Sequence, residues 1–332
     1  MAAAQTIPYV TLDVFTKDVF KGNPLGVVFL PTPTALTQTQ KQLISKEFNY
    51  SETIFVHPID KQNSPSQRRI DIFTTKQELP FAGHPTVGAA SWILYLSPDA
   101  SVQHVNTILT KAGPIPISLK PSGDEVTALI PHDVRIHQKR FPAEELLRLH
   151  PSLKPFLSNG SVAEEAQQGF PIVSIVKGMA QVHVQLPSLE ALAAVTAASG
   201  GEFVADDDVS QGGYLDDGWG GRGLVVIYFH VRDVVDEVTG KTVIRTRMLL
   251  ESEEDPATGS AASGLVAYLA LSDASKGAKA DRYQDFYVVQ GVEMGRRSDI
   301  GLRVGLKSDG TGIESVELSG SSVKVAEGEI RV

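Results

Sequence analysis

The sequence predicts an α+β fold made of two similar halves, each with a central helix wrapped by mostly antiparallel strands. Short β-rich segments separated by turn residues recur along the 332 residues, and few helical stretches lie between them. Two of the predicted helices are unusually apolar and rich in small residues, and each follows a Gly-containing loop. Apolar residues make up 42% of the chain, which is enough for the cores of two domains.

The first half reads as strands around one apolar helix. A helix with Thr-rich capping chemistry is predicted at residues 36–48, and a helix at 86–96 follows the loop at 81–85. The polar, Pro-containing region 131–155 then marks a domain boundary and holds one short helix at 144–149. Strands are predicted at residues 9–15, 25–30, 52–57, 69–74, 107–109, 115–119 and 126–130.

The second half repeats this plan loosely. A helix is predicted at residues 189–198, and a small-residue helix at 261–271 follows the loop at 255–260. Strands are predicted at residues 171–176, 181–185, 224–230, 243–249, 323–325 and 329–332. The sequence therefore predicts an N-terminal domain at 1–130, a C-terminal domain at 131–320 and a last strand at 321–332 that could pack back on the first domain.

The two loop-to-helix junctions resemble each other. One runs Ala-Gly-His-Pro-Thr-Val-Gly-Ala-Ala over residues 82–90, and the other Ala-Thr-Gly-Ser-Ala-Ala-Ser-Gly over 257–264. The pattern alone leaves open whether they form an internal repeat. Two such helices with their N-termini at one cleft would form an anion site from backbone N–H groups and aligned dipoles.

Composition excludes several classes of site. The chain has no Cys, so disulfides, thiolate nucleophiles and Cys-ligated metals are ruled out. The eight His residues lack metal-ligand spacing, and no nucleotide-binding motif stands between a strand and a helix, so we expect neither a metal nor a cofactor. A net charge of −9 argues against a nucleic-acid partner but leaves an anionic small-molecule substrate open. Without a signal-like start or a long apolar run, we expect a cytoplasmic protein that does not enter a membrane.

Residues 199–222 are rich in Gly and Asp. The simplest interpretation is a solvated surface loop. A lid over a binding cleft and a calcium loop are the alternatives, although the spacing does not match an EF-hand.

Three segments place ionisable groups among apolar residues. Glu47 falls at the end of the helix predicted at 36–48. The helix dipole disfavours an ionised carboxylate there, which suits a group that both accepts and returns a proton. An exposed surface Glu is the alternative. His84 falls at a helix start, where the dipole favours neutral imidazole; a structural histidine is the alternative. Asp255 and Ser260 flank the second helix start, where they could bind a carboxylate or merely cap the helix.

Together these segments resemble the PhzF family, the phenazine-biosynthesis isomerases and their relatives. The matching pieces occur in the family's order and span nearly the whole chain. They are residues 13–15 with 22–24, 45–49 with 51–53, 73–74 with 78–86, 254–261, and 290–291 with 294–296.

The resemblance implies a diaminopimelate-epimerase-like fold of two barrel-like domains around central helices, a site between them, and a homodimer. It implies that Glu47 removes a proton from one carbon and returns it to another. His84, Asp255 and Ser260 would then hold the polar groups of the substrate. Gly83 and Gly259 would contribute backbone N–H contacts to the substrate. Asn23 and Ser45 would support Glu47 and the wall of the site.

The missing Cys excludes the two-thiol racemisation used by relatives of this fold and favours one-base transfer by Glu47. Arg297 stands where the family usually has Pro, and residues 199–222 look like an insertion, so the substrate does not follow from the resemblance. The leading hypothesis is a cofactor-independent isomerase acting on a small carboxylate-bearing substrate. A non-catalytic binding homologue and a lyase or dehydratase on the same scaffold are the alternatives.

Overall fold

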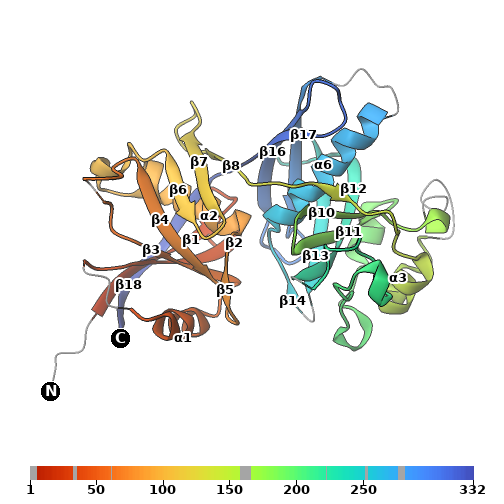
Figure 1. Cartoon of the computed structure of the whole chain (residues 1–332), viewed down its shortest axis with the longest axis horizontal. Helices are drawn as coiled ribbons and strands as arrows, with labels where there is room; N and C mark the ends of the chain where they lie inside the picture. The colour runs from red at the N-terminus through yellow and green to blue at the C-terminus, as the bar shows by residue number, and fades with distance from the viewer. Residues whose placement is uncertain are drawn as a thin grey trace. The chain divides into compact units, whose positions relative to one another are not determined.

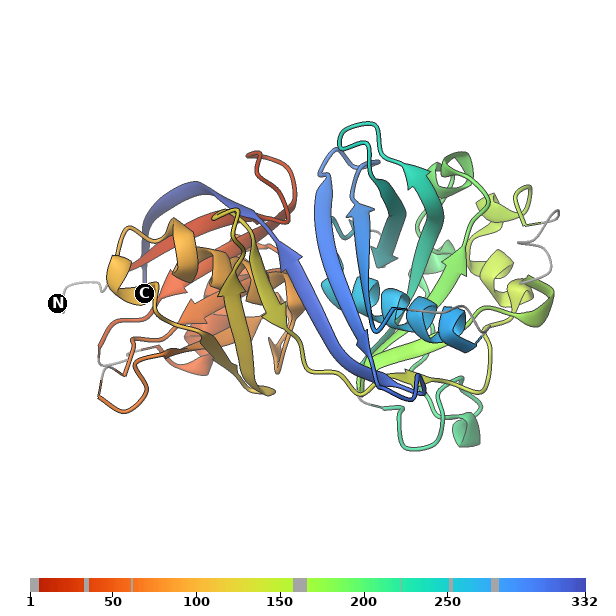
Figure 2. The ribbon, with the colours of Figure 1, turned by 90° about the horizontal axis from the view of Figure 1, so that it is seen from above.

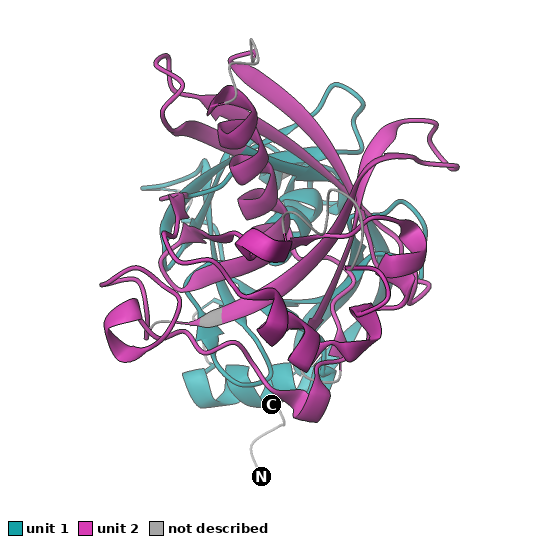
Figure 3. Ribbon diagram, turned by 90° about the vertical axis from the view of Figure 1, so that its right-hand side faces the viewer, with its two compact units in different colours: residues 1–131, 317–332 teal, residues 132–316 magenta. Residues whose placement is uncertain are grey.

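The computed structural model describes residues 6–32, 36–60, 62–157, 166–221, 223–250, 253–275 and 281–332. The chain divides into two compact units, which Figure 3 colours separately. Unit 1 comprises residues 1–131 and 317–332, and unit 2 comprises residues 132–316. Both units combine many strands with few helices, which confirms the predicted α+β class.

Unit 1 is a strongly curved, mostly antiparallel sheet. β1 pairs antiparallel with both β18 and β2, and β3 pairs antiparallel with β4, while β2–β3 and β4–β6 are parallel. β6, β7 and β8 follow as antiparallel neighbours, and β8 pairs with the end of β17. The strands are β1 (Thr6–Val14), β2 (Asn23–Phe29), β3 (Glu52–Val56), β4 (Gln67–Phe73), β5 (Glu78–Leu79), β6 (Thr107–Thr110), β7 (Gly113–Leu119), β8 (Val126–Leu129), β17 (Ile313–Gly320) and β18 (Ser322–Arg331).

The central helix of unit 1 is α2 (Gly83–Ser91), and all nine of its residues are buried. It contacts β1, β2, β3, β8 and β18 and continues into a π-helical turn, η1 (Trp92–Leu96). Small residues allow this close packing, because a Cβ on Gly88 would lie 2.3 Å from Leu25 Cδ2.

A second helix, α1 (Gln38–Phe48), covers the opposite face of this sheet (Figure 1). Its Ile44 packs with Val28 of β2, whereas Leu25 of the same strand faces α2; residues three apart on a strand point to opposite faces. The start of α1 is fixed by a capping box between Thr37 and Gln40. The helix that carries Glu47 is therefore anchored against a sheet whose other face holds the central helix.

A buried charge cluster fixes the middle of α1. Lys41 Nζ lies 2.5 Å from Asp71 Oδ2 on β4, and His57 Nε2 lies 2.7 Å from the same oxygen. Burial raises the pKa of Asp71, but its hydrogen bonds to His57 and Lys41 outweigh that effect and hold it well below the ordinary value. The ionised Asp71 is thereby paired rather than isolated in the apolar interior.

The strands of unit 2 continue the hydrogen-bonded sheet of the chain. β9–β10, β10–β11, β12–β13 and β15–β16 are antiparallel, while β11–β12 and β13–β15 are parallel. Its elements are β9 (Arg135–Ile136), α3 (Ala143–Leu149), η3 (Pro151–Leu153), β10 (Ile172–Val176), β11 (Met179–Gln185), α5 (Leu189–Ala193), β12 (Leu224–Val235), β13 (Thr242–Leu250), β14 (Glu253–Glu254), α6 (Gly259–Ser275), β15 (Tyr283–Gln290) and β16 (Ser298–Leu306).

The central helix of unit 2 is α6, which runs across the strands of that unit (Figure 2). It contacts β10, β11, β15 and β16, and a Cβ on Gly264 would lie 2.4 Å from Gln181 Oε1. Each unit thus has a small-residue helix surrounded by strands, which confirms the predicted plan. No helix in the described part of the chain has the length and apolarity needed to cross a membrane.

Several predicted elements differ in extent, and two of the differences have a clear cause. α5 ends at Ala193 instead of residue 198, because the following residues turn away from helical geometry and Arg247 Nη1 binds the carbonyl oxygens of Leu192, Ala193 and Val195. The two short strands predicted at 323–325 and 329–332 are one strand, β18, which pairs along the whole of β1.

The Gly- and Asp-rich stretch packs on the core of unit 2, and its last residue, Arg222, lies outside the described residues. Leu215 is buried, and Val204 forms a β-bridge with Val225. The carboxylate of Asp208 accepts hydrogen bonds from the backbone N–H groups of Gly218 and Gly220, which closes the loop on itself. Within the described ranges, no three His, Asp or Glu side chains gather as a metal would require.

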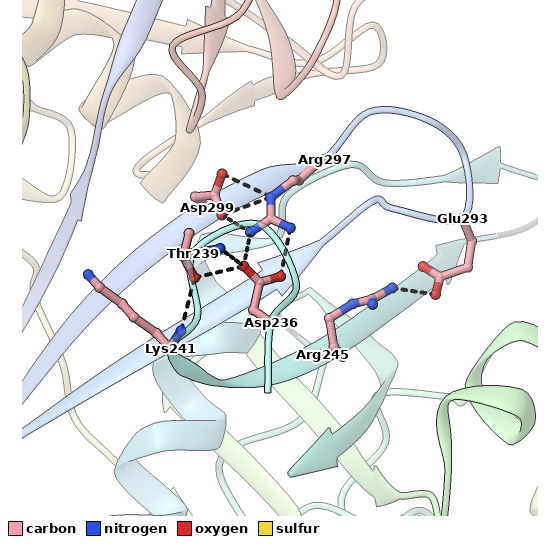
Figure 4. A network of polar contacts seen from close by, with 7 residues as sticks. All are labelled: Asp236, Thr239, Lys241, Arg245, Glu293, Arg297 and Asp299. Atoms are coloured by element: carbon pink, nitrogen blue, oxygen red, sulfur yellow. Dashed lines mark hydrogen bonds and ion pairs between the residues drawn. The ribbon is translucent and has the colours of Figure 1, made fainter. Parts of the chain in front are cut away.

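Arg297 lies in a polar network of unit 2 (Figure 4). Its Nη1 and Nη2 donate to the two carboxylate oxygens of Asp236 at 2.8 and 2.9 Å, and Nη2 also donates to Asp299 at 2.7 Å. Thr239 donates two further hydrogen bonds to Asp236. Arg297 therefore ties the β12–β13 turn to the start of β16.

Replacing Arg297 by Gln is expected to destabilise unit 2 by about 2 kcal/mol, because buried Asp236 loses both charge-assisted hydrogen bonds from the guanidinium. Urea denaturation measures the change. Arg303→Gln on β16 is the matched control, since its ion pair with Asp285 is half-exposed and should contribute less than about 1 kcal/mol. Equal effects of the two substitutions would contradict the role given to Arg297.

Candidate active site

Glu47 lies in the last turn of α1, and its side chain is exposed. Asn49 closes the helix in the left-handed conformation at φ 54°, and its N–H donates to the carbonyl oxygen of Ser45. Ser45 is buried, and its hydroxyl donates to the carbonyl oxygen of Lys41 at 3.0 Å. Glu47 forms no hydrogen bond or ion pair with the described residues, so its carboxylate is accessible at a helix end with a defined geometry.

The first turn of α2 presents two of the other predicted site residues. Gly83 and His84 are its first and second residues, and Ala82 at the N-cap supplies no side-chain acceptor. The His84 side chain is only 4% exposed, and its Nδ1 lies 3.0 Å from Glu52 Oε2. Its buried Nε2 has no hydrogen-bond partner among the described residues. Such an orphaned buried nitrogen is costly and marks a position where a ligand could bind.

The Glu52 carboxylate determines which nitrogen of His84 carries the proton. Burial raises the pKa of Glu52, but the hydrogen bond and charge of His84, with a hydrogen bond from Ser51, bring it below the ordinary value. Because ionised Glu52 only accepts hydrogen bonds, Nδ1 must donate to it. Nε2 is then free to accept a hydrogen bond or, if His84 is charged, to donate one.

Glu52 lies within one of the matching motifs, residues 51–53, but the sequence alone indicates no role for it. The parallel pairing of β2 with β3 places Glu52 opposite Leu25, two residues from Asn23. Asn23 is buried, and its Oδ1 accepts a hydrogen bond of 3.3 Å from the hydroxyl of Ser51. A chain of contacts thus links Asn23, Ser51, Glu52 and His84. Only the spatial meeting of β3 with the start of α2 reveals it.

The corresponding turn of unit 2 orders Asp255. Its Oδ2 accepts a hydrogen bond of 2.7 Å from the hydroxyl of Thr258, and its Oδ1 accepts one of 3.3 Å from the N–H of Ala257. Gly259 and Ser260 then form the first two positions of α6. These positions are equivalent to those of Gly83 and His84 in α2. The Asp255 carboxylate therefore shapes the turn before the helix.

Gln290 is a second residue to which the sequence assigned no role. Its amide nitrogen donates to the carbonyl oxygen of Asp255 and to the hydroxyl of Thr258 at 2.8 and 2.9 Å. Its amide oxygen accepts from the N–H of Thr258 and from the hydroxyl of buried Tyr228. Gln290 is fully buried, so its three contacts with Asp255 and Thr258 fix the turn, while Tyr228 holds its amide oxygen.

Comparison with known proteins gives the family. The family model for phenazine biosynthesis-like protein (PhzC-PhzF) matches residues 12–210 and 241–328. The family model leaves residues 211–240 unmatched. This segment overlaps the insertion expected at 199–222 only at residues 211–222 and continues to residue 240.

Relatives cover nearly the whole chain. An uncharacterized isomerase of Mesorhizobium japonicum is 30% identical over 98% of this chain and 99% of its own length. Trans-2,3-dihydro-3-hydroxyanthranilate isomerase of Pseudomonas aeruginosa is 30% identical over 96% of this chain and 98% of its own.

A solved structure of similar fold is the PhzF-family phenazine biosynthesis protein of Bacillus anthracis. It has a TM-score of 0.71 at 22% identity and covers 99% of this chain and 100% of its own. The family match and the full-length relatives agree with the resemblance found in the motifs. The chain therefore belongs to the PhzC-PhzF family of phenazine biosynthesis-like proteins and is an isomerase.

Proposed function

We propose that this isomerase works without a cofactor and moves one proton between two carbons of a small carboxylate-bearing substrate, with Glu47 as the acid/base group. The carboxylate of Glu47 takes the proton from the first carbon, and the electron pair of that C–H bond becomes a new π bond to the neighbouring carbon. The π electrons of the substrate's adjoining double bond move to the second carbon, where they form the new C–H bond. Glu47, now neutral, returns the proton to the second carbon on the same face. The enzyme ends the cycle in its starting charge state.

The other predicted residues bind the substrate in this proposal. His84 offers Nε2 to a polar atom, while the N–H groups of Gly83 and Gly259, with the hydroxyl of Ser260, favour an anionic group at helix N-termini. Asp255 orients a substrate donor, and Asn23 and Ser45 support the positions of His84 and Glu47. The family resemblance further implies a homodimer as the working form.

The observation that supports the proposal most is the Glu52–His84 pair. A histidine whose Nδ1 is held by an ionised carboxylate and whose buried Nε2 lacks a partner is a positioned acid/base or hydrogen-bonding group, the arrangement that proton-transfer enzymes use to fix a tautomer.

The reaction class is tested by incubating the protein in heavy water with trans-2,3-dihydro-3-hydroxyanthranilate, the compound in the name of the Pseudomonas aeruginosa relative. We expect an isomer of the substrate, identified by NMR and mass spectrometry, that carries deuterium at the second carbon wherever the proton on Glu47 exchanges with solvent before it is returned. Loss of water or ammonia would instead show a lyase. Binding without isomerisation, for this compound and for other small unsaturated carboxylates, would favour a non-catalytic homologue and overturn the proposal.

Replacing Glu52 by Gln is expected to lower kcat by about 10–100-fold with a smaller change in KM, because the anion that holds the Nδ1 proton of His84 is lost. The amide oxygen can still accept from Nδ1, so the melting temperature should change little. Steady-state kinetics checks the result, with Glu253→Gln at an exposed position of β14 as the control. A loss of stability with unchanged kcat would assign Glu52 a structural role only.

A further inference from the structure

Arg68 is a partly buried cation of unit 1. It lies near the start of β4, and its guanidinium forms no hydrogen bond or ion pair with the described residues. Its Nε is fully buried and has no hydrogen-bond partner within that part of the chain. Burial lowers the pKa of Arg68, and the negative charge of Asp99 offsets this effect only in part. A partly desolvated, unpaired guanidinium is unfavourable unless something else satisfies it.

A cavity of about 240 Å³ adjoins this guanidinium. Its walls are mostly apolar, and the rings of Phe29 and Trp92 lie 5.2 Å apart at its side. Asp99 and Ser97 are the other polar residues at its edge. The apolar wall is completed by Val56, Ile93, Pro98 and Val102.

The helix that forms one wall has an unusual geometry. Trp92 and Ile93 belong to the five-residue π-helical turn that follows α2. Such turns are rare and are found preferentially at functional sites, since the wider turn re-aims side chains at some cost in backbone hydrogen bonding. Here the turn brings the Trp92 side chain to the ring of Phe29 and to the cavity beside Arg68.

This cavity is separate from the candidate active site within unit 1. His84 is at the first turn of α2, whereas Trp92 follows its last residue. Eight residues at 1.5 Å each place them roughly 12 Å apart along the helix axis. A ligand beside Trp92 would therefore lie at the opposite end of the central helix from the imidazole of His84.

We propose that this cavity binds a small organic carboxylate, with the carboxylate paired to Arg68 and an apolar body against Trp92 and Phe29. A guanidinium presents parallel N–H donors that match the two oxygens of a carboxylate. The apolar walls favour a hydrocarbon body over inorganic phosphate or sulfate. This inference does not depend on the catalytic role of Glu47.

The fluorescence of Trp92 can report ligand binding in this cavity. The chain has two Trp residues, so in a Trp219→Phe background all Trp fluorescence comes from the cavity wall. Cyclohexanecarboxylate is the probe, because it does not absorb where Trp is excited, and cyclohexanecarboxamide is its neutral counterpart. We expect a saturable fluorescence change with the carboxylate and at least about tenfold weaker binding of the amide.

Variants identify the partner of the carboxylate. Arg68→Gln should weaken carboxylate binding at least about tenfold and leave the amide unaffected. Arg69→Gln is the matched control, since Arg69 points to the other face of β4 and contacts Asp71. Glu47→Gln should bind the probe with unchanged affinity, which separates this cavity from the proposed active site.

A stability measurement gives an independent check. In the absence of ligand, Arg68→Met should raise the melting temperature, because an apolar side chain of similar length replaces an unpaired, partly desolvated cation. Equal affinity for acid and amide, unchanged binding in Arg68→Gln, or no saturable change at Trp92 would each overturn the proposal. A lower melting temperature in Arg68→Met would show that Arg68 is structurally paired and would also overturn it.

Discussion

Replacing Glu47 by Gln is expected to lower kcat by about 10²–10⁴-fold, the usual contribution of a positioned general acid/base. The amide keeps the shape of the side chain but can neither take nor return a proton at carbon. Glu47 is exposed at the end of α1 and forms no hydrogen bond with the described residues, so the substitution should leave folding intact. KM should change little, because His84, Asp255 and Ser260 are proposed to bind the polar groups of the substrate.

Steady-state kinetics at neutral pH measures this effect, and thermal unfolding verifies the fold. Glu144→Gln is the matched control, since Glu144 is another exposed helical glutamate and lies on α3, which carries no proposed site residue. Glu47→Asp should retain part of the activity, because a carboxylate remains but sits one methylene further from the reacting carbon. If Glu47→Gln and Glu144→Gln turn over substrate equally fast, Glu47 is a surface residue.

Unit 2 is expected to lose stability as the pH falls below neutrality. His183 is fully buried on β11 with no partner for either ring nitrogen, and His230 on β12 has no partner for Nδ1 among the described residues. Burial lowers the pKa of His230 to about 3, and it holds the pKa of His183 well below its ordinary 6.5. Both imidazoles are therefore neutral in the folded state.

The sign of the effect follows from proton binding. The unfolded chain takes up protons at these histidines below pH 6.5, whereas the folded chain stays neutral down to about pH 3 for His230. Stability is therefore complete above pH 6.5 and falls with pH by about 1.4 kcal/mol per unit for each histidine. At about pH 5, His230 alone should lower the free energy of unfolding by about 2 kcal/mol, and His183 adds to this loss. Burial also lowers the pKa of His137 and His150 in the same unit, which adds to the trend.

Urea denaturation at neutral pH and at about pH 5 measures this loss, and hydrogen exchange locates it in unit 2. His230→Phe removes one titrating group, so the difference between the two pH values should shrink by about 2 kcal/mol, whatever the substitution costs in packing at neutral pH. An unchanged pH difference in this variant would show that His230 does not cause the acid sensitivity.

The local features of both halves could be predicted from sequence because they depend on short motifs. The small residues of α2 and α6, including Gly88 and Gly264, signal helices that strands approach closely. The loop residues before these helices indicate where each begins. Gly83 and Gly259 occupy equivalent first positions, as the comparison of the two junctions indicated.

Features that depend on tertiary contacts could not be predicted. The contact of Glu52 with His84 requires the parallel pairing of β2 with β3 and the position of α2, which no local pattern encodes. Gln290 reaches Thr258 across 32 residues for the same reason. The β18 strand was divided in two because Ala326, Glu327 and Gly328 interrupt its pattern, whereas its pairing with β1 carries the strand through them.

The most direct test of the central claim is the stereochemistry of the transferred proton. The substrate is labelled with deuterium at the carbon that loses its proton, and the product of a single turnover is examined by NMR. One-base transfer by Glu47 predicts that the new C–H or C–D bond forms on the same face of the substrate from which the deuterium was removed. It also predicts that Glu47→Gln forms no product and leaves the deuterium on the substrate. Delivery of hydrogen to the opposite face would require a second base and would contradict the account.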